Sequence, residues 1–147
     1  LEGCRFVKEL KKYTKCKLSI NFFNITNYKD DDLAYACETA SDSSADFMYF
    51  ADTHGGLDLV ENLEMFKRYT KLIKKIGMIP GLHLHDHSGK AYFNYRNLVK
   101  AGFEATDVSF AGAGSEGPFL QVDLSALTDL GNAVQVETRY GQRIWPA

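Results

Sequence analysis

Four short apolar runs recur about every 30 residues along the chain, and a helical pattern fills each interval between them. The runs are centred near Ile20, Tyr49, Leu82 and Val108. This is the period of a β-strand followed by a helix that returns the chain to the same edge of a sheet. Repeated units of this kind with apolar strands predict a parallel sheet covered by helices. The pattern therefore indicates an α/β fold.

The spacing of apolar residues gives the expected order of elements. Strands are predicted over residues 18–24, 47–51, 79–85 and 106–110, and helices over residues 6–13, 30–40, 59–76, 91–99 and, more weakly, 122–130. The first helix should bury Phe6, Val7, Leu10 and Tyr13, and Asp30 should cap the second helix. Asp58 and Glu61 resemble a capping pair for the long helix, and the glycines of residues 112–117 predict a turn.

Two architectures share this local pattern, the open doubly wound sheet and the eight-stranded barrel. A complete barrel needs about 250 residues. The chain has 147 residues, so four strand-and-helix units would form about half of a barrel. The chain opens at Leu1 directly into a helical pattern, and we therefore expect it to be a piece of a longer protein.

Charge and composition exclude several classes of function. The formal net charge is −2, which gives no electrostatic reason to expect nucleic acid or an anionic membrane as a partner. No apolar run approaches the roughly 18 residues of a membrane span. Cys4, Cys16 and Cys37 are expected to be reduced core residues, which favours a cytoplasmic location.

The most specific local signal is His83-Leu84-His85 at the end of the third predicted strand. Side chains alternate across a strand, so both imidazoles should lie on one face and could chelate a divalent metal. The carboxyl ends of parallel strands are where sites lie in such folds. The alternative is a pair of half-buried histidines bonded to the backbone. His87 follows as a surface residue or a support for the other two.

Other polar residues follow the neighbouring strands. Asp52 and Thr53 end the second strand, where a carboxylate could orient a histidine or accept a proton. The alternative is that Asp52 caps its own loop. Asp107 and Ser109 share one face of the fourth strand, which indicates either a site or a satisfied polar network. The glycine-rich turn that follows would allow close approach of a ligand.

Four segments in this order resemble the metal-dependent TIM-barrel lyases and synthases that include 3-hydroxy-3-methylglutaryl-CoA lyase, 4-hydroxy-2-oxovalerate aldolase, isopropylmalate synthase and homocitrate synthase. They are Phe50–Gly55, Gly81–Gly89, Ala91–Gly102 and Asp107–Gly114. In the same order, they are similar to four family features: the Asp-Thr-x-Gly turn after barrel strand 6, the His-x-His segment of strand 7, the helix that follows it, and strand 8 with its glycine turn. The resemblance covers roughly residues 19–130.

This resemblance implies a (β/α)8 TIM-barrel fold in which residues 1–147 form one C-terminal half-barrel of strands 5 to 8. It implies a carbon–carbon lyase, aldolase or synthase that acts on a 2-oxo acid or acyl-CoA through a metal-stabilised enolate. His83 and His85 would bind Mn²⁺ or Mg²⁺, with Zn²⁺ and Co²⁺ as alternatives. Asp52 would support the ligands or transfer a proton, and Thr53 would contact the substrate. The residues expected to close over the substrate are Gly112, Gly114 and Ser115.

The chain departs from the family pattern in two places. It contains no Asp-Arg-Glu motif, which in the family supplies a metal-binding carboxylate and a catalytic arginine. The family often has an asparagine after the strand-8 glycines, where this chain reads Gly117-Pro-Phe-Leu-Gln121. We therefore expect partners, either a missing N-terminal half-barrel or a second copy, and weak activity of the chain alone. The alternatives are a TIM-barrel metallohydrolase and a non-catalytic half-barrel for assembly or binding.

Overall fold

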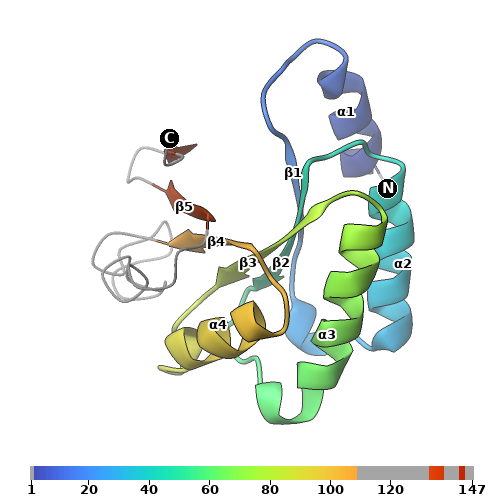
Figure 1. Cartoon of the computed structure of the whole chain (residues 1–147). Coiled ribbons are helices and arrows are strands. Elements are labelled where there is room, and N and C mark those ends of the chain that lie inside the picture. Colours follow the sequence, from blue (N-terminus) through green and yellow to red (C-terminus); the bar gives the residue numbers. More distant parts are fainter. Residues whose placement is uncertain (1, 109–132, 138–142, 145–147) are drawn as a thin grey trace.

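The computed structural model describes residues 2–108, 133–137 and 143–144 (Figure 1). In chain order the elements are α1 (Glu2–Lys11), β1 (Ser19–Phe22), the 3-10 helix η1 (Ile25–Asn27), α2 (Asp30–Ser41), β2 (Phe47–Asp52), α3 (Leu59–Lys75), β3 (Ile79–Leu84), α4 (Ala91–Lys100), β4 (Ala105–Val108), β5 (Ala133–Glu137) and β6 (Arg143–Ile144). The four predicted strands and the helices between them are all present. None of the helices in the described ranges combines the length and apolar character that a membrane span requires.

The strands form one sheet in the order β1-β2-β3-β4-β5-β6. The first five run parallel to their neighbours, and β6 runs antiparallel to β5. The predicted α/β fold with a parallel sheet is confirmed, and it is consistent with part of a TIM-barrel-like domain. The numbering of these strands as barrel strands 5 to 8 stays a prediction. The sequence analysis did not predict β5 and β6.

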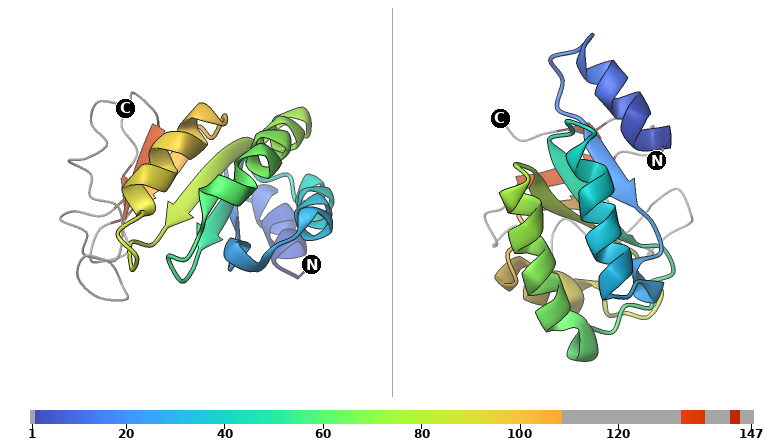
Figure 2. Two further views of the ribbon diagram at one scale, coloured as in Figure 1. Left: turned by 90° about the horizontal axis from the view of Figure 1, so that it is seen from below. Right: turned by 90° about the vertical axis from the view of Figure 1, so that its right-hand side faces the viewer.

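One face of the sheet is covered by helices and holds the main core. α2 and α3 lie side by side against it, and α4 lies next to α3 (Figures 1 and 2). Met48, Phe50 and Leu82 point into this core because alternate residues of β2 and β3 face the helices. The rings of Phe50, Phe66 and Phe103 meet here with centroids 6.0 to 6.4 Å apart. This apolar layer fixes the positions of the strand ends.

The opposite face carries a second, smaller group of packed side chains. Phe47, Tyr49 and Ala105 are buried together, with Ile79 packed against them. The parallel register pairs Tyr49 with Gly81 and Gly81 with Ala105. A Cβ atom on Gly81 would lie 2.7 to 2.8 Å from three carbon atoms of the Tyr49 ring. The ring therefore occupies the space that a side chain at Gly81 would fill.

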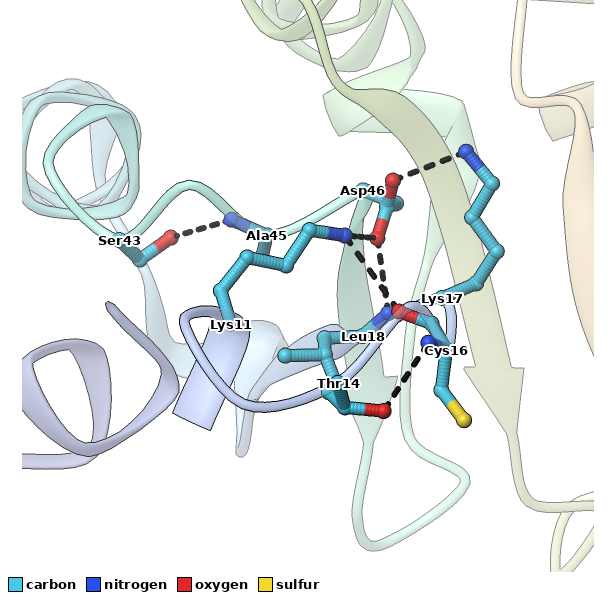
Figure 3. A network of polar contacts seen from close by, with 8 residues as sticks. All are labelled: Lys11, Thr14, Cys16, Lys17, Leu18, Ser43, Ala45 and Asp46. Atoms are coloured by element: carbon cyan, nitrogen blue, oxygen red, sulfur yellow. Dashed lines mark hydrogen bonds and ion pairs between the residues drawn. The ribbon is translucent and has the colours of Figure 1, made fainter. Parts of the chain in front are cut away.

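A network of ion pairs joins the end of α1 to the amino ends of the strands (Figure 3). The Asp46 carboxylate accepts hydrogen bonds from the ammonium groups of Lys11 and Lys17 and from the backbone N–H of Leu18. Burial by itself would raise the pKa of Asp46, but these donors outweigh it and lower the pKa from 3.8 to about 2. The network lies at the opposite ends of the strands from His83 and contributes to stability.

Several expectations about the helices are corrected. Of the four apolar residues expected to be buried in the first helix, Val7 packs against the core, next to the buried Cys4, whereas Phe6, Leu10 and Tyr13 are 67%, 37% and 83% exposed. A single helix can turn only one narrow stripe toward the edge of the sheet, and residues three apart form that stripe. Cys16 is exposed rather than in the core.

The expected helix caps also differ. The α2 helix begins at Asp30 itself, and the residue that precedes it, Lys29, donates its N–H to Oδ2 of Asp32 at 2.9 Å. Asp32 is therefore the capping side chain, because a carboxylate at the third helical position reaches back to the residue before the helix. The Glu61 side chain, the end of the fourth strand beyond Val108, the glycine turn and the weak helix at 122–130 lie outside the described residues.

Candidate metal site at the carboxyl ends of the strands

Strands β2 and β3 end side by side, and this places the predicted site residues at one edge of the sheet. The register pairs Ala51 with His83 and Asp52 with Leu84. Leu84 faces the helix-covered core, so His83 and His85 face the other side. Their ring centroids are 5.0 Å apart, with an interplanar angle of 84°. The structure thus brings the two imidazoles together, as the alternation of a strand predicts.

His83 contacts a carboxylate on the neighbouring strand. Its Nδ1 lies 2.8 Å from Oδ2 of Asp107. Gly81 pairs with Ala105, and two residues further along each strand stand His83 and Asp107, so their side chains meet on the same face. The Asp107 side chain is 4% exposed and that of His83 is 16% exposed. The contact is therefore partly buried.

His85 is held by the backbone of β2. Its Nδ1 lies 3.0 Å from the carbonyl oxygen of Asp52, and the residue is buried. Carbonyl and carboxylate oxygens only accept hydrogen bonds, so the neutral form of each ring carries its hydrogen on Nδ1. Nε2 is then the nitrogen of each ring that can coordinate a metal.

The Asp52 carboxylate organises the loop that follows β2. It accepts hydrogen bonds from the hydroxyl of Thr26 at 2.7 Å and from the backbone N–H groups of Gly56 at 3.1 Å and Leu57 at 3.0 Å. These contacts match the alternative interpretation, in which Asp52 caps its own loop. The Thr53 hydroxyl oxygen accepts the N–H of Asn24 at 2.9 Å and so joins this loop to the end of β1.

This loop packs directly on the segment that contains the histidines. Gly55 has a φ of +61°, and a Cβ atom there would lie 2.8 Å from the carbonyl oxygen of His85 and 2.9 Å from the nitrogen of His87. The Ser88 hydroxyl donates to the carbonyl oxygen of Gly55 at 2.6 Å. The His87 ring lies 5.8 Å from that of His85 and is exposed, so its direction, which the sequence left open, is toward its neighbour.

Asp107 is the site residue that sequence analysis did not select. The available signal was the position of Asp107 and Ser109 on the inner face of a buried strand, which left a site and a satisfied polar network as alternatives. The contact with His83 depends on strand register, which the sequence does not specify. Ser109, Gly112, Gly114 and Ser115 lie outside the described residues.

The donor set fits a divalent metal in its chemistry. Two imidazoles with Nδ1 engaged lie on one face of the sheet, and Oδ1 of Asp107 is buried without a hydrogen-bond partner among the described residues. Within those same residues, His, Cys, Asp and Glu do not gather in a group of three or more that could hold a metal by itself. The two histidines could therefore supply only part of a coordination shell.

Comparisons with solved structures agree with this fold. The carboxyl transferase domain of Rhizobium etli pyruvate carboxylase is 22% identical, with a TM-score of 0.60, over 87% of this chain and 22% of that one. The same domain with pyruvate gives 20% identity and a TM-score of 0.63, over 83% of this chain and 21% of that one. These likenesses show the fold, and the chain spans about a fifth of the length of those structures.

The sequence itself carries the assignment to a family. A search of curated proteins found no match. The sequence model of the HMGL-like family, in contrast, matches residues 4–136. That range includes β1 to β4 and both histidines of the candidate site. Because the match extends over most of the sequence, this chain belongs to the HMGL-like family.

Proposed function

We propose that the chain carries the metal-holding part of a divalent-metal-dependent carbon–carbon lyase, aldolase or synthase that acts on a 2-oxo acid or an acyl-CoA. The observation that carries this proposal is the pair of histidines whose rings lie 5.0 Å apart, each with Nδ1 engaged by an acceptor. Membership of the HMGL-like family supports it, since the family includes metal-dependent aldolases, lyases and synthases.

In this proposal His83 and His85 hold the cation through Nε2, with Mn²⁺ or Mg²⁺ as the preferred ion and Zn²⁺ or Co²⁺ as alternatives. When bound, a divalent cation supplies a Lewis acid that stabilises negative charge on the carbonyl oxygen of the substrate. Asp52 keeps His85 in place through its carbonyl group and is the proposed proton-transfer residue of the loop. The Thr53 hydroxyl, which accepts a bond from Asn24, can still donate its own hydrogen to a substrate oxygen.

The remaining parts of the site come, in this proposal, partly from this chain and partly from other polypeptide. Gly112, Gly114 and Ser115 would close over the substrate, while further ligands and a catalytic arginine would be supplied by a second half-barrel or a second copy of the chain. Two histidines alone leave a divalent ion open to solvent on most sides. The much greater length of the matched structures is consistent with a larger assembly.

Metal binding by the chain tests the proposal directly. Calorimetric titration with MnCl₂ should show binding that falls at least tenfold in His83→Ala and in His85→Ala. His54→Ala is the matched control, because His54 is exposed on the loop, and its affinity should equal that of the wild type. Equal affinity in all four proteins would refute the assignment of the ligands.

Reaction chemistry is tested with pyruvate in ²H₂O. With Mn²⁺ present, methyl hydrogens of pyruvate should exchange slowly in the wild-type chain and not in the two histidine variants, as followed by NMR. Turnover of simple 4-hydroxy-2-oxo acids should be weak. Hydrolysis of ester or amide substrates without any exchange would instead favour a metallohydrolase.

One observation favours a second candidate, a non-catalytic module for assembly. β1 ends the sheet, with β2 as its one described neighbour, and the aromatic side chains of Phe6, Tyr13 and Phe23 are 67%, 83% and 63% exposed. Open strand edges and exposed aromatic groups favour association. Sedimentation analysis should therefore show dimers or larger species. A monomer with unaltered Mn²⁺ binding would argue against the module and leave the metal site intact.

A further inference from the structure

Asp107 has an environment that is unusual for a carboxylate. It lies in β4 on the face away from the helices, its side chain is 4% exposed, and its neighbours in the strand are the buried residues Ala105 and Thr106. Oδ2 accepts a hydrogen bond from His83, and Oδ1 is buried with no partner in the described part of the chain. A carboxylate with one satisfied oxygen is costly to bury, so the arrangement calls for a compensating positive charge.

The two histidines of the site are oriented by different kinds of group. His85 donates its Nδ1–H to a neutral carbonyl oxygen, whereas His83 donates to a charged carboxylate. Both contacts fix the same tautomer, but only the second brings negative charge next to a ring that could hold a cation. A charged acceptor also makes the imidazole a stronger ligand than a neutral one does.

From these contacts we propose that Asp107 is a positioning residue for His83. It holds the ring in the tautomer that presents Nε2, and it couples cation binding to the stability of the sheet because the bound ion offsets its buried charge. The metal-free protein then carries an unmatched carboxylate, and the loaded protein does not. This inference rests on the proposed function, in which His83 and His85 hold a divalent cation.

The first test separates the charge of Asp107 from its hydrogen bond. Asp107→Asn keeps an oxygen that can accept the Nδ1–H of His83 and removes the charge, while Asp107→Ala removes both. In calorimetric titrations with MnCl₂, affinity should fall about tenfold in Asp107→Asn and up to about 100-fold in Asp107→Ala. Asp46→Asn is the control, since Asp46 directly precedes β2 at the other end of the strands from Asp107, and it should bind Mn²⁺ as the wild type does.

Urea unfolding with and without Mn²⁺ distinguishes the proposed role of Asp107 from a purely structural one. In EDTA, the urea midpoint of Asp107→Asn should equal or exceed that of the wild type, because a buried charge without a full set of partners is gone. With Mn²⁺ the order should reverse, since the wild type gains more from the ion. A lower midpoint in EDTA with unchanged Mn²⁺ affinity would overturn the proposal.

A spectroscopic measurement tests the tautomer without any metal. Long-range ¹H–¹⁵N NMR spectra of the histidine rings should show His83 with hydrogen on Nδ1 in the wild type and in Asp107→Asn, and a population with hydrogen on Nε2 in Asp107→Ala. A wild-type His83 with hydrogen mainly on Nε2 would overturn the proposal. The wild type and Asp107→Asn decide the question even where Asp107→Ala does not fold.

The outcomes also distinguish this inference from the proposed function. If His83→Ala leaves Mn²⁺ binding unchanged, the proposed metal site fails. If His83→Ala abolishes binding while both Asp107 variants bind as the wild type does, the metal site stands and the role of Asp107 is wrong.

Discussion

The carbonyl oxygen of Asp52 lies 3.0 Å from Nδ1 of His85, and this contact links the end of β2 to the candidate metal site on β3. The carboxylate of the same residue accepts hydrogen bonds from the Thr26 hydroxyl and from the N–H groups of Gly56 and Leu57. The backbone of Asp52 thus orients the histidine while its side chain keeps the loop folded. The ring position of His85 therefore depends on the loop.

Asp52→Ala should be strongly destabilising, because it leaves two backbone N–H groups and a hydroxyl without their buried acceptor. We expect a loss of about 2–4 kcal/mol in the free energy of unfolding, measured in urea. Asp42→Ala, at an exposed aspartate after α2, should change it by less than about 0.5 kcal/mol. Equal losses in the two variants would show that the loop contacts of Asp52 contribute little.

Gly55→Ala should destabilise the protein by more than the cost of placing an alanine in a left-handed backbone conformation, and it should also weaken Mn²⁺ binding. Gly55 and Gly89 both have left-handed backbones, with φ of +61° and +70°. A Cβ atom at Gly89 meets nothing within 4 Å, whereas at Gly55 it meets backbone atoms of His85 and His87 below 3 Å. Gly89→Ala should cost about 1 kcal/mol, and Gly55→Ala clearly more, with weaker Mn²⁺ binding in Gly55→Ala alone. Unchanged Mn²⁺ affinity in Gly55→Ala would contradict this coupling.

The period of the strand explains why part of the site could be predicted. Side chains alternate along every strand, so His83 and His85 had to share a face once residues 79–85 were assigned as a strand. The end of β2 at Asp52 followed from the apolar run before it. These features are local, and local patterns are readable in one sequence.

Features that depend on pairing between distant segments were not predictable in this way. The contact of His83 with Asp107 requires the register of β3 with β4, which is set by packing on the whole sheet. The sequence analysis missed β5, a strand of five residues that follows a long interval. The expected burial around the first helix was right for Val7 and wrong for Phe6, Leu10 and Tyr13. The helix packs on the edge of the sheet through Cys4 and Val7, although Phe6 and Tyr13 have larger side chains.

The Asp46 network predicts a loss of stability in acid. The folded-state pKa of Asp46 is about 2, below its ordinary value of 3.8, so the unfolded chain binds a proton first as the pH falls. The contribution is complete above about pH 4 and is lost as the pH falls toward 2. Urea midpoints between pH 5 and 2 should fall less steeply in Asp46→Asn than in the wild type. Parallel pH profiles would show that the network contributes no pH-dependent stability.

The contact between Tyr49 and Gly81 predicts that substitutions at these two positions have strongly non-additive effects on the free energy of unfolding. A Cβ atom on Gly81 would overlap the Tyr49 ring, and this ring is 1% exposed and packed with Ala105, so it has no room to move aside. Gly81→Ala should therefore cost about 1–3 kcal/mol in the free energy of unfolding. In a Tyr49→Ala background, where the ring is gone, the same change should cost less than about 0.5 kcal/mol.

The double-mutant cycle is measured by urea unfolding of the four proteins. Gly3→Ala provides the control, because a Cβ atom at this position in α1 meets nothing within 4 Å, and an alanine within a helix should stabilise by up to about 1 kcal/mol. Equal costs of Gly81→Ala with and without the Tyr49 ring would mean that the ring does not fill this space. A large coupling would instead identify Gly81 as the position that lets an aromatic ring form the layer beneath His83 and Asp107, since Gly81 and Ala105 precede these residues by two positions on the same face.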